Sequence, residues 1–245
     1  MMRSRTLALA LLITAVMSCR TQPPQPPQAP QPLPDFPLEV YRPAVGTTVY
    51  KIDGDHSRVD ILVRRGGKLA RFGHDHVVSA TRFYGYIRLA ANDFTRSQAD
   101  VRLALHSLIV DDPAIRRQFA LDTEPTPQDI EKTSAHMRGK VLQTDFWPQV
   151  HLKVEMTGGT PDAPEARLTM RLHGEEKSFP ITFKAVGMGT GQIQADGSFS
   201  LRQSDYGITP FSILGGGLQV LDQVDVTFKL QADQVDSATP NQLEQ

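Results

Sequence analysis

The sequence is poor in cysteine and in net charge, and each shortage excludes a class of protein. One of its 245 residues, Cys19, is a cysteine, which excludes an internal disulfide, an Fe–S cluster and any CxxC zinc or redox site. Lys and Arg number 26 against 27 Asp and Glu, so basic residues are not in excess. Nucleic-acid binding needs a clustered basic face, and we therefore expect no nucleic-acid partner.

Common enzyme motifs are missing as well. The sequence contains no GxSxG, HExxH, GxxxxGK[ST] or GxGxxG segment, which are signatures of several hydrolase and nucleotide-binding sites. Gly187–Gly191 and Gly215–Gly217 are rich in glycine, but no helix pattern follows either segment, so both predict turns. Asp111 and Asp112 predict a turn and a helix cap rather than a catalytic carboxylate pair. We expect a protein that is not an enzyme and needs no cofactor.

The first 18 residues have the pattern of a secretory signal peptide. Met1–Arg5 carries two arginines and no acid, and Thr6–Met17 is an apolar run of about a dozen residues, too short to span a bilayer. Val16–Cys19 resembles a bacterial lipobox with the single cysteine at the lipidated position. We therefore expect residues 1–18 to be removed and Cys19 to become a lipid-modified N-terminus. The alternative is an ordinary signal peptide that contains a cysteine by chance.

These features predict a protein of the cell envelope that faces the periplasm. Two or more acyl chains on Cys19 would anchor it stably in a membrane. By resemblance to bacterial lipoproteins, Arg20 in place of an aspartate favours the outer membrane. Residues 19–45 include the Pro- and Gln-rich run 22–34, which favours polyproline II and predicts a semi-rigid tether. Residues 236–245 have the composition of a polar tail.

The folded domain is expected over residues 46–235, where the dominant period is two. Successive side chains in a strand point to opposite faces, so alternating apolar and polar residues give one buried face and one solvent-exposed face. This favours antiparallel sheet, because parallel strands buried on both faces read as continuous apolar runs. Closure into a barrel would remove exposed edges, although a sandwich has the same pattern. The alternating segments are 59–63, 150–156, 166–172, 181–185 and 224–230.

One region, residues 112–142, breaks the alternation and predicts two short helices. Pro113–Phe119 and Pro127–Met137 each follow a capping residue, Asp112 or Thr126, and each places proline at the first helical position. Turn-forming residues separate the predicted strands elsewhere. These turns are expected at 66–67, 91–93, 158–161, 173–175, 187–191 and 196–197.

Three passages resemble the YceI-like polyisoprenoid-binding family. The first is Tyr50–Ser57, YKIDGDHS, followed by the strand at 59–63. The second is Val141–Leu152, VLQTDFWPQVHL, in which an aromatic residue and a proline precede a strand. The third comprises Phe199–Ile208 and Leu221–Leu230, which are similar to the C-terminal strands of the family. Order and spacing agree over residues 47–232.

The resemblance implies an all-β fold, an extended antiparallel lipocalin-like β-barrel with one or two short inserted helices. It also implies an apolar tunnel for a long isoprenoid, quinone or other lipid tail, and a periplasmic location. The segment 68–83 departs from the family pattern, because Ala70–Ser79, ARFGHDHVVS, replaces the usual glycine and aromatic residues. This departure leaves open whether the ligand is an ordinary isoprenoid.

Two histidines of this segment, His74 and His76, form the candidate site. In an extended strand they share one face with Phe72 and Val78, while Asp75 points the other way. At the mouth of a tunnel, the imidazoles would bind the polar head of a lipid, since imidazole can donate to a phosphate or quinone oxygen. A purely structural pair is the simplest alternative.

A divalent metal ion is a further alternative. Imidazoles at positions i and i+2 lie close enough to chelate one metal, provided that a third ligand comes from another strand. The histidines that could supply it are His56, His106, His136 and His151. His56 is the nearest in the sequence, so the expected set is His74, His76 and His56. Such a site would make the protein a metal-dependent exported enzyme or a metal carrier.

Overall fold

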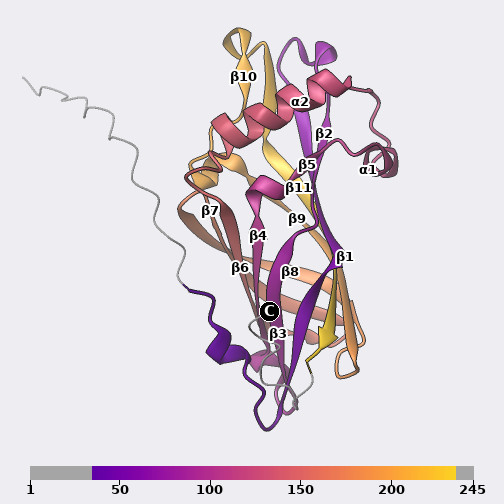
Figure 1. Ribbon diagram of the computed structural model, residues 1–245, viewed down its shortest axis with the longest axis vertical. Coiled ribbons are helices and arrows are strands. Elements are labelled where there is room, and N and C mark those ends of the chain that lie inside the picture. The colour runs from indigo at the N-terminus through magenta and orange to yellow at the C-terminus, as the bar shows by residue number, and fades with distance from the viewer. Residues whose placement is uncertain (1–34, 236–245) are drawn as a thin grey trace, which may run out of the picture.

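The computed structural model describes residues 35–235, and within them the chain folds into a closed antiparallel barrel (Figure 1). Eight strands form the wall in the order β1-β3-β4-β6-β7-β8-β9-β11, and pairing of β11 with β1 closes it. The predicted all-β barrel is confirmed. The predicted signal peptide, Cys19 and the predicted polar tail lie outside the described residues. The strands are β1 Thr47–Gly66, β2 His76–Ala80, β3 Phe83–Ala90, β4 Gln98–Ala104, β5 Ile109–Val110, β6 Gln149–Thr160, β7 Ala163–Leu172, β8 Glu175–Val186, β9 Gln192–Arg202, β10 Ser212–Ile213 and β11 Leu218–Gln234.

The period of two in the sequence matches the burial of alternate residues in the strands. In β7 the buried side chains occur at every second position from Pro164 to Leu172, and they point into the barrel. Residues between them are exposed or half-buried. A one-residue slip in pairing would turn all of these apolar side chains outward, so the inward face fixes the register of each strand.

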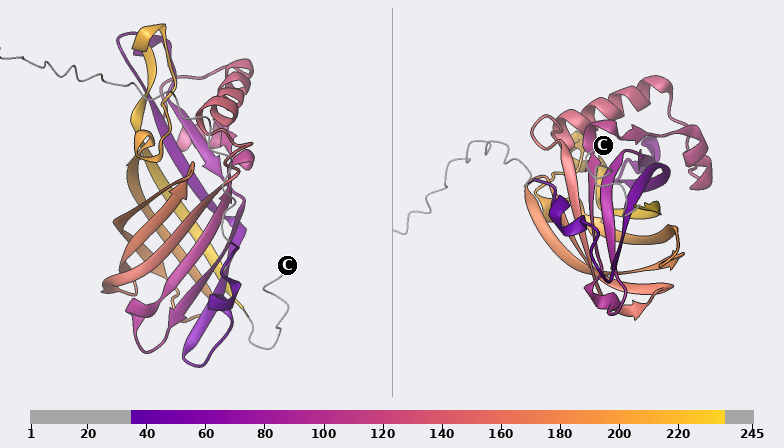
Figure 2. Two further views of the ribbon diagram at one scale, coloured as in Figure 1. Left: turned by 90° about the vertical axis from the view of Figure 1, so that its left-hand side faces the viewer. Right: turned by 60° about the horizontal axis from the view of Figure 1, so that its bottom comes forward.

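The first strand is much longer than its partners, and this gives the barrel an extension at one end. Residues 47–51 of β1 pair with β3, whereas Val59–Val63 pair with β2. The short strand β5 then pairs with β2, outside the closed ring. The upper part of β1 therefore carries a separate collar made of β2 and β5 (Figures 1 and 2).

Two helices follow the collar, as the sequence predicts. α1 (Pro113–Gln118) begins at Asp112, whose carboxylate accepts from the backbone N–H of Ala114 at 2.8 Å and of Ile115 at 3.2 Å. α2 (Pro127–His136) begins with a capping box. The next turn, Met137–Val141, continues the helix in the wider π geometry. α2 lies across the end of the barrel next to the collar (Figures 1 and 2). No helix in residues 35–235 is long and apolar enough to cross a membrane.

Packed side chains fill the opposite end of the barrel. Tyr50, Ile52, Leu89 and Ile193 form a buried cluster there, and Met188 from the β8–β9 turn packs against it. The Tyr50 hydroxyl donates to the carbonyl of Thr190 in the same turn at 2.7 Å. The predicted turn at 187–191 is thus confirmed, and it holds this end of the barrel together.

The segment before β1 packs on the outside of the barrel. The short helical turn η1 (Leu38–Tyr41) places Tyr41 in a fully buried position, where its hydroxyl donates to Asp100 at 2.5 Å. His151 contacts the other oxygen of the same carboxylate at 2.8 Å. Residues 35–45, assigned by composition to the tether, therefore contact the folded domain through Tyr41.

The turn expected at 196–197 is wrong, because Asp196 and Gly197 lie inside β9. Gly197 pairs with both Phe228 of β11 and Phe183 of β8. The two phenylalanine rings lie 6.2 Å apart, and a Cβ on residue 197 would come within 2.7 Å of Phe228 Cζ and 2.9 Å of Phe183 Cβ. Glycine is required here by the space for two rings inside the barrel, not by a turn.

Replacing Gly197 by alanine tests this reading. The added methyl group must displace both rings, and overpacking of this kind costs about 1–3 kcal/mol of unfolding free energy. Denaturant unfolding followed by circular dichroism measures the loss. Gly139→Ala is the control, since a Cβ at residue 139 has no atom within 4 Å; within its helical turn, alanine should leave stability unchanged or raise it by up to about 1 kcal/mol. Equal stability of the two variants would contradict the packing argument.

Candidate functional site

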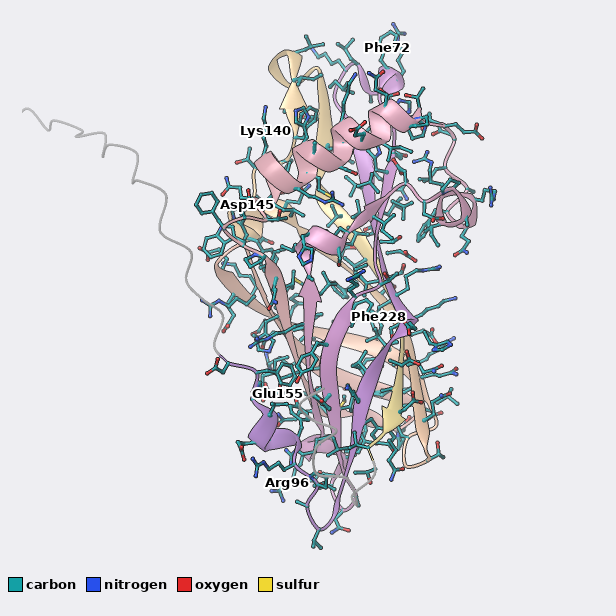
Figure 3. The ribbon with its side chains drawn as sticks, viewed as in Figure 1. Phe72, Arg96, Lys140, Asp145, Glu155 and Phe228 are labelled. Carbon is teal, nitrogen blue, oxygen red and sulfur yellow. The ribbon has the colours of Figure 1, made fainter. Side chains whose placement is uncertain are left out.

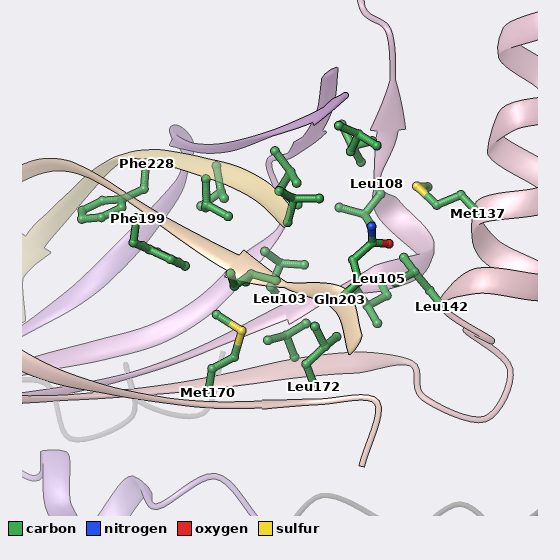
Figure 4. Close-up of a pocket in the computed structure, with 18 of the residues that line it drawn as sticks. Leu103, Leu105, Leu108, Met137, Leu142, Met170, Leu172, Phe199, Gln203 and Phe228 are labelled. Atoms are coloured by element: carbon green, nitrogen blue, oxygen red, sulfur yellow. The ribbon is translucent and has the colours of Figure 1, made fainter. Parts of the chain in front are cut away.

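The barrel encloses a cavity of ≈ 650 Å³, so its centre is hollow. Figure 4 shows side chains from several strands and from the region around α2 converging on this space. Almost the whole wall is aliphatic or aromatic. The labelled wall residues are Leu103, Leu105, Leu108, Met137, Leu142, Met170, Leu172, Phe199 and Phe228.

Polar side chains line the cavity at the end covered by α2. They come from the upper end of β1, from the segment leading into β2, from α2, and from the start of η6 (Gln203–Tyr206) and of β11. Phe72 belongs to the same end, far from Arg96 at the other end of the molecule (Figure 3). We call this polar end the mouth. Its polar residues are Arg65, His74, His76, Asp129, Lys132, Thr133, His136, Gln203 and Gln219.

The structure places both predicted histidines at the mouth. His76 starts β2 opposite Val63, and His74 lies just before it with the two ring centroids 6.2 Å apart. Asp75 points away from the cavity and accepts from the backbone N–H of Arg65 at 2.8 Å. Phe72 also lines the cavity, although it belongs to the helical turn η2 (Ala70–Phe72) and not to an extended strand as expected.

His76 is part of a buried ionic network that the sequence did not reveal. Its Nδ1 lies 2.5 Å from Oδ2 of Asp111, whose side chain is completely buried. The other oxygen of Asp111 accepts from Arg116 at 2.5 Å and from the backbone N–H of Val77 at 3.1 Å. Arg116 also donates to the carbonyl oxygens of Asp75 and Thr123. Both oxygens of the carboxylate are therefore hydrogen-bonded.

The surroundings of Asp111 favour its ionised form. Burial alone would raise the pKa of this carboxyl, but the hydrogen bonds from His76, the Val77 N–H and Arg116 outweigh burial and hold the pKa below its usual value. Asp111 also has a positive φ of 55°. This backbone conformation is uncommon outside glycine, asparagine and aspartate, and it turns the carboxylate back toward β2.

His74 has no such partner. Its Nδ1 is buried, and within residues 35–235 nothing accepts from it or donates to it. Across the mouth, the electrostatic influence of His74 and of Lys132 lowers the pKa of Asp129, after the larger effect of the hydrogen bonds from Thr126. The mouth thus contains one imidazole in a fixed orientation and a second imidazole with an unused nitrogen.

The third residue of the metal alternative, His56, lies elsewhere. It is exposed at an irregular point of β1, and its Nδ1 lies 2.6 Å from Asp53. Seven residues of strand separate it from Val63, the partner of His76, a distance of roughly 20 Å. Within the described part of the chain, no three His, Cys, Asp or Glu residues gather in a way that could hold a metal ion. The structure therefore does not bring the expected metal ligands together.

Sequence reasoning missed the partners of the histidines. Sequence patterns predict a turn at Asp111, and they give no sign that Arg116, Asp129 and Lys132 belong to the site. The only available signal was the Asp111-Asp112 pair before a proline, in which Asp112 alone has the expected capping role. Contact between His76 and Asp111 spans 35 residues, and local patterns do not report it.

An antiparallel barrel around one apolar cavity with a polar mouth defines a lipocalin-like fold built to enclose a ligand. The particular family follows from the sequence. A profile of the YceI-like domain matches residues 50–232, and the chain belongs to this family. A search of curated protein sequences found no significant match.

Solved structures with the same fold include two distant relatives. BcnA from Burkholderia cenocepacia is 11% identical with a TM-score of 0.54, covering 74% of this chain and 98% of its own. A polyisoprenoid binding domain from Saccharophagus degradans, implicated in plant cell wall breakdown, is 14% identical with a TM-score of 0.51, covering 76% and 98%. At these identities the likeness establishes the fold alone.

The adjacent aspartates Asp111 and Asp112 should respond differently to the same substitution. Asp111→Asn leaves the buried Arg116 without a negative partner, which should cost about 3 kcal/mol or more of unfolding free energy. Asp112→Asn should cost less than about 0.5 kcal/mol, because asparagine caps helices as well as aspartate does. Denaturant unfolding of both variants at pH 7 measures the difference.

The contribution of Asp111 should also depend on pH. Because its pKa is lower in the folded protein than in the unfolded chain, its contribution is complete above the ordinary value near pH ~4 and is lost as the pH falls through the folded value. The stability gap between wild type and Asp111→Asn should therefore narrow as the pH is lowered below ~4. A gap that is constant over this range would show that the charge of Asp111 is not what stabilises the fold.

Proposed function

We propose that this protein binds and carries a long apolar molecule, such as an isoprenoid, a quinone or another lipid tail, inside its barrel. The observation that carries this proposal is the cavity itself, with apolar walls, a packed far end and polar groups gathered at the mouth. Membership of the YceI-like family and the likeness to the polyisoprenoid binding domain of Saccharophagus degradans support it.

The physical chemistry of the cavity suits a tail better than a compact polar molecule. Each buried methylene contributes about 0.8 kcal/mol, so a chain of several isoprene units is held without any directional contact along its length. The cavity of ≈ 650 Å³ falls in the range of pockets that enclose small molecules. Specificity then depends on the few polar side chains at the mouth.

A binding role fits the residues better than catalysis does. The polar groups of the mouth include one oriented imidazole, but no described serine, threonine or cysteine forms a hydrogen bond with His74 or His76. The metal-dependent alternative lacks its third ligand, as described above. Family membership likewise supports a binding protein rather than an enzyme.

The proposed place of action is the cell envelope. A signal peptide at residues 1–18 and the lipobox-like Val16–Cys19 support export and lipid anchoring. The proline-rich run 22–34 would hold the barrel away from the membrane surface, facing the periplasm. Arg20 after the cysteine supports the outer membrane as the site of the anchor.

Native mass spectrometry before and after organic extraction tests the proposal. The purified protein should carry lipid, and the extracted protein should take up an added isoprenoid alcohol. Val154→Trp places a large side chain on the cavity wall, and the loss of space for two methylenes alone should weaken uptake by about tenfold.

The control is Val186→Trp, the same substitution at a strand residue that is 70% exposed. It should bind lipid as the wild type does. The proposal fails if the extracted wild type takes up no isoprenoid, or if both tryptophan variants lose uptake equally while remaining folded.

Anchoring makes a separate prediction. The wild-type protein should fractionate with membranes until detergent is added, and Cys19 should carry thioether-linked lipid. Cys19→Ser removes the thiol that is modified, so the precursor should accumulate without lipid. Membrane fractionation and intact mass measure both effects. Normal maturation of Cys19→Ser, together with a soluble wild type, would contradict lipid anchoring.

A further inference from the structure

One side of the His76 ring is bound to the protein, and the other side faces the cavity. Nδ1 is held by Asp111, a residue that does not line the cavity, whereas His76 itself does. The two nitrogens of an imidazole point in divergent directions, so Nε2 is directed away from Asp111. Within residues 35–235, the His76 ring forms its hydrogen bond through Nδ1, and none is formed by Nε2.

Asp111 fixes which nitrogen of His76 carries the proton. An ionised carboxylate can only accept hydrogen bonds, so Nδ1 must be the donor of the 2.5 Å contact. Arg116 binds the same carboxylate and supplies its counter-charge, so ionisation of Asp111 does not require a charged imidazole. In neutral His76 the remaining lone pair therefore lies on Nε2, at the mouth of the tunnel.

We infer that the His76–Asp111 pair forms a hydrogen-bond acceptor that selects ligands with a hydroxyl head, an alcohol or a phenol, over the same tail without a donor. This inference rests on the proposed function, because it concerns the head of a ligand whose tail occupies the cavity. Of the two cations at the mouth, Arg65 is paired with Asp122 at 2.6 Å, and Lys132 interacts electrostatically with Asp129. An anionic head would therefore meet a lone pair at Nε2 without an unbalanced positive charge beside it.

The rest of the mouth fits a hydroxyl group. The His76 side chain is only 15% exposed and Val78 beside it is buried, so water around the head group is limited and a hydrogen bond there is strengthened. Gln219 lines the same mouth, and its side-chain amide can donate to the same ligand oxygen. A hydroxyl can both donate to Nε2 of His76 and accept from a second group, which an ether oxygen cannot do.

Three probes with one tail test the inference at pH 8. Farnesol, its methyl ether and farnesyl monophosphate share the tail and differ only in the head. Competition against a fluorescent apolar probe gives each dissociation constant. Wild-type protein should bind farnesol about three- to tenfold more tightly than the ether, the value of one net hydrogen bond, and should bind the phosphate no better than the alcohol.

His76→Phe keeps an aromatic ring on the cavity wall but removes the acceptor. It should bind farnesol and the ether equally, while its affinity for the ether stays close to that of the wild type. His106→Phe is the matched control, because it makes the same substitution at an exposed histidine that does not line the cavity. This control should keep the preference for farnesol.

A measurement on the wild-type protein tests the inference even if the His76→Phe variant misfolds. Long-range ¹H–¹⁵N spectra of the wild-type imidazoles report which nitrogen is protonated, and His76 should show a protonated Nδ1 and a bare Nε2 that shifts when farnesol binds. A protonated Nε2 would overturn the inference. Equal binding of farnesol and ether by wild type, a preference that survives in His76→Phe, or tighter binding of the phosphate would also overturn it. Failure of all three probes to bind would instead overturn the proposed function.

Discussion

Pairing of β11 with β1 is the constraint on which the rest of the structure depends. Once the sheet closes, each of the eight wall strands is paired on both sides, and the apolar face of each must point into one shared interior. No second sheet is then needed to cover those side chains. The register shift between Asp53 and Arg58 bends β1 around the barrel, so that one strand forms both the wall and the extension beyond it. Closure at this diameter leaves the interior hollow.

The mouth is a consequence of the unequal strand lengths. β1 continues past its pairing with β3, and β2 pairs with this upper part of β1 on the edge opposite β11. β5 then brings Asp111 beside β2, and α1 returns Arg116 to the same point. The ionic network thus belongs to the collar. Its charged groups can be placed there because they do not have to enter the apolar interior of the barrel.

The tail and the head of a ligand would be bound by different kinds of interaction in this protein. The apolar walls stabilise a tail by burying its surface, which requires no directional contact, so they tolerate many tails of suitable length. The mouth has a few polar groups with a fixed orientation. Buried polar groups discriminate strongly between head groups that form hydrogen bonds with them and head groups that leave them unpaired. In this fold, affinity and selectivity are therefore separated along the axis of the barrel.

Local rules in the sequence determined most of the fold. Alternation at 150–156 and 166–172 predicted strands correctly, and Asp112-Pro113 and Thr126-Pro127 predicted the helix starts, because capping and strand faces involve neighbouring residues. The spacing of His74 and His76 likewise placed both on the cavity face. Asp196-Gly197 predicted a turn, yet the two phenylalanines opposite Gly197 decided its place in a strand. Only the tertiary structure decided three features: the hollow interior, the separation of His56 from the site, and the contact of His76 with Asp111. Each depends on segments that are distant in the sequence and that barrel closure or the β2–β5 pairing brings together.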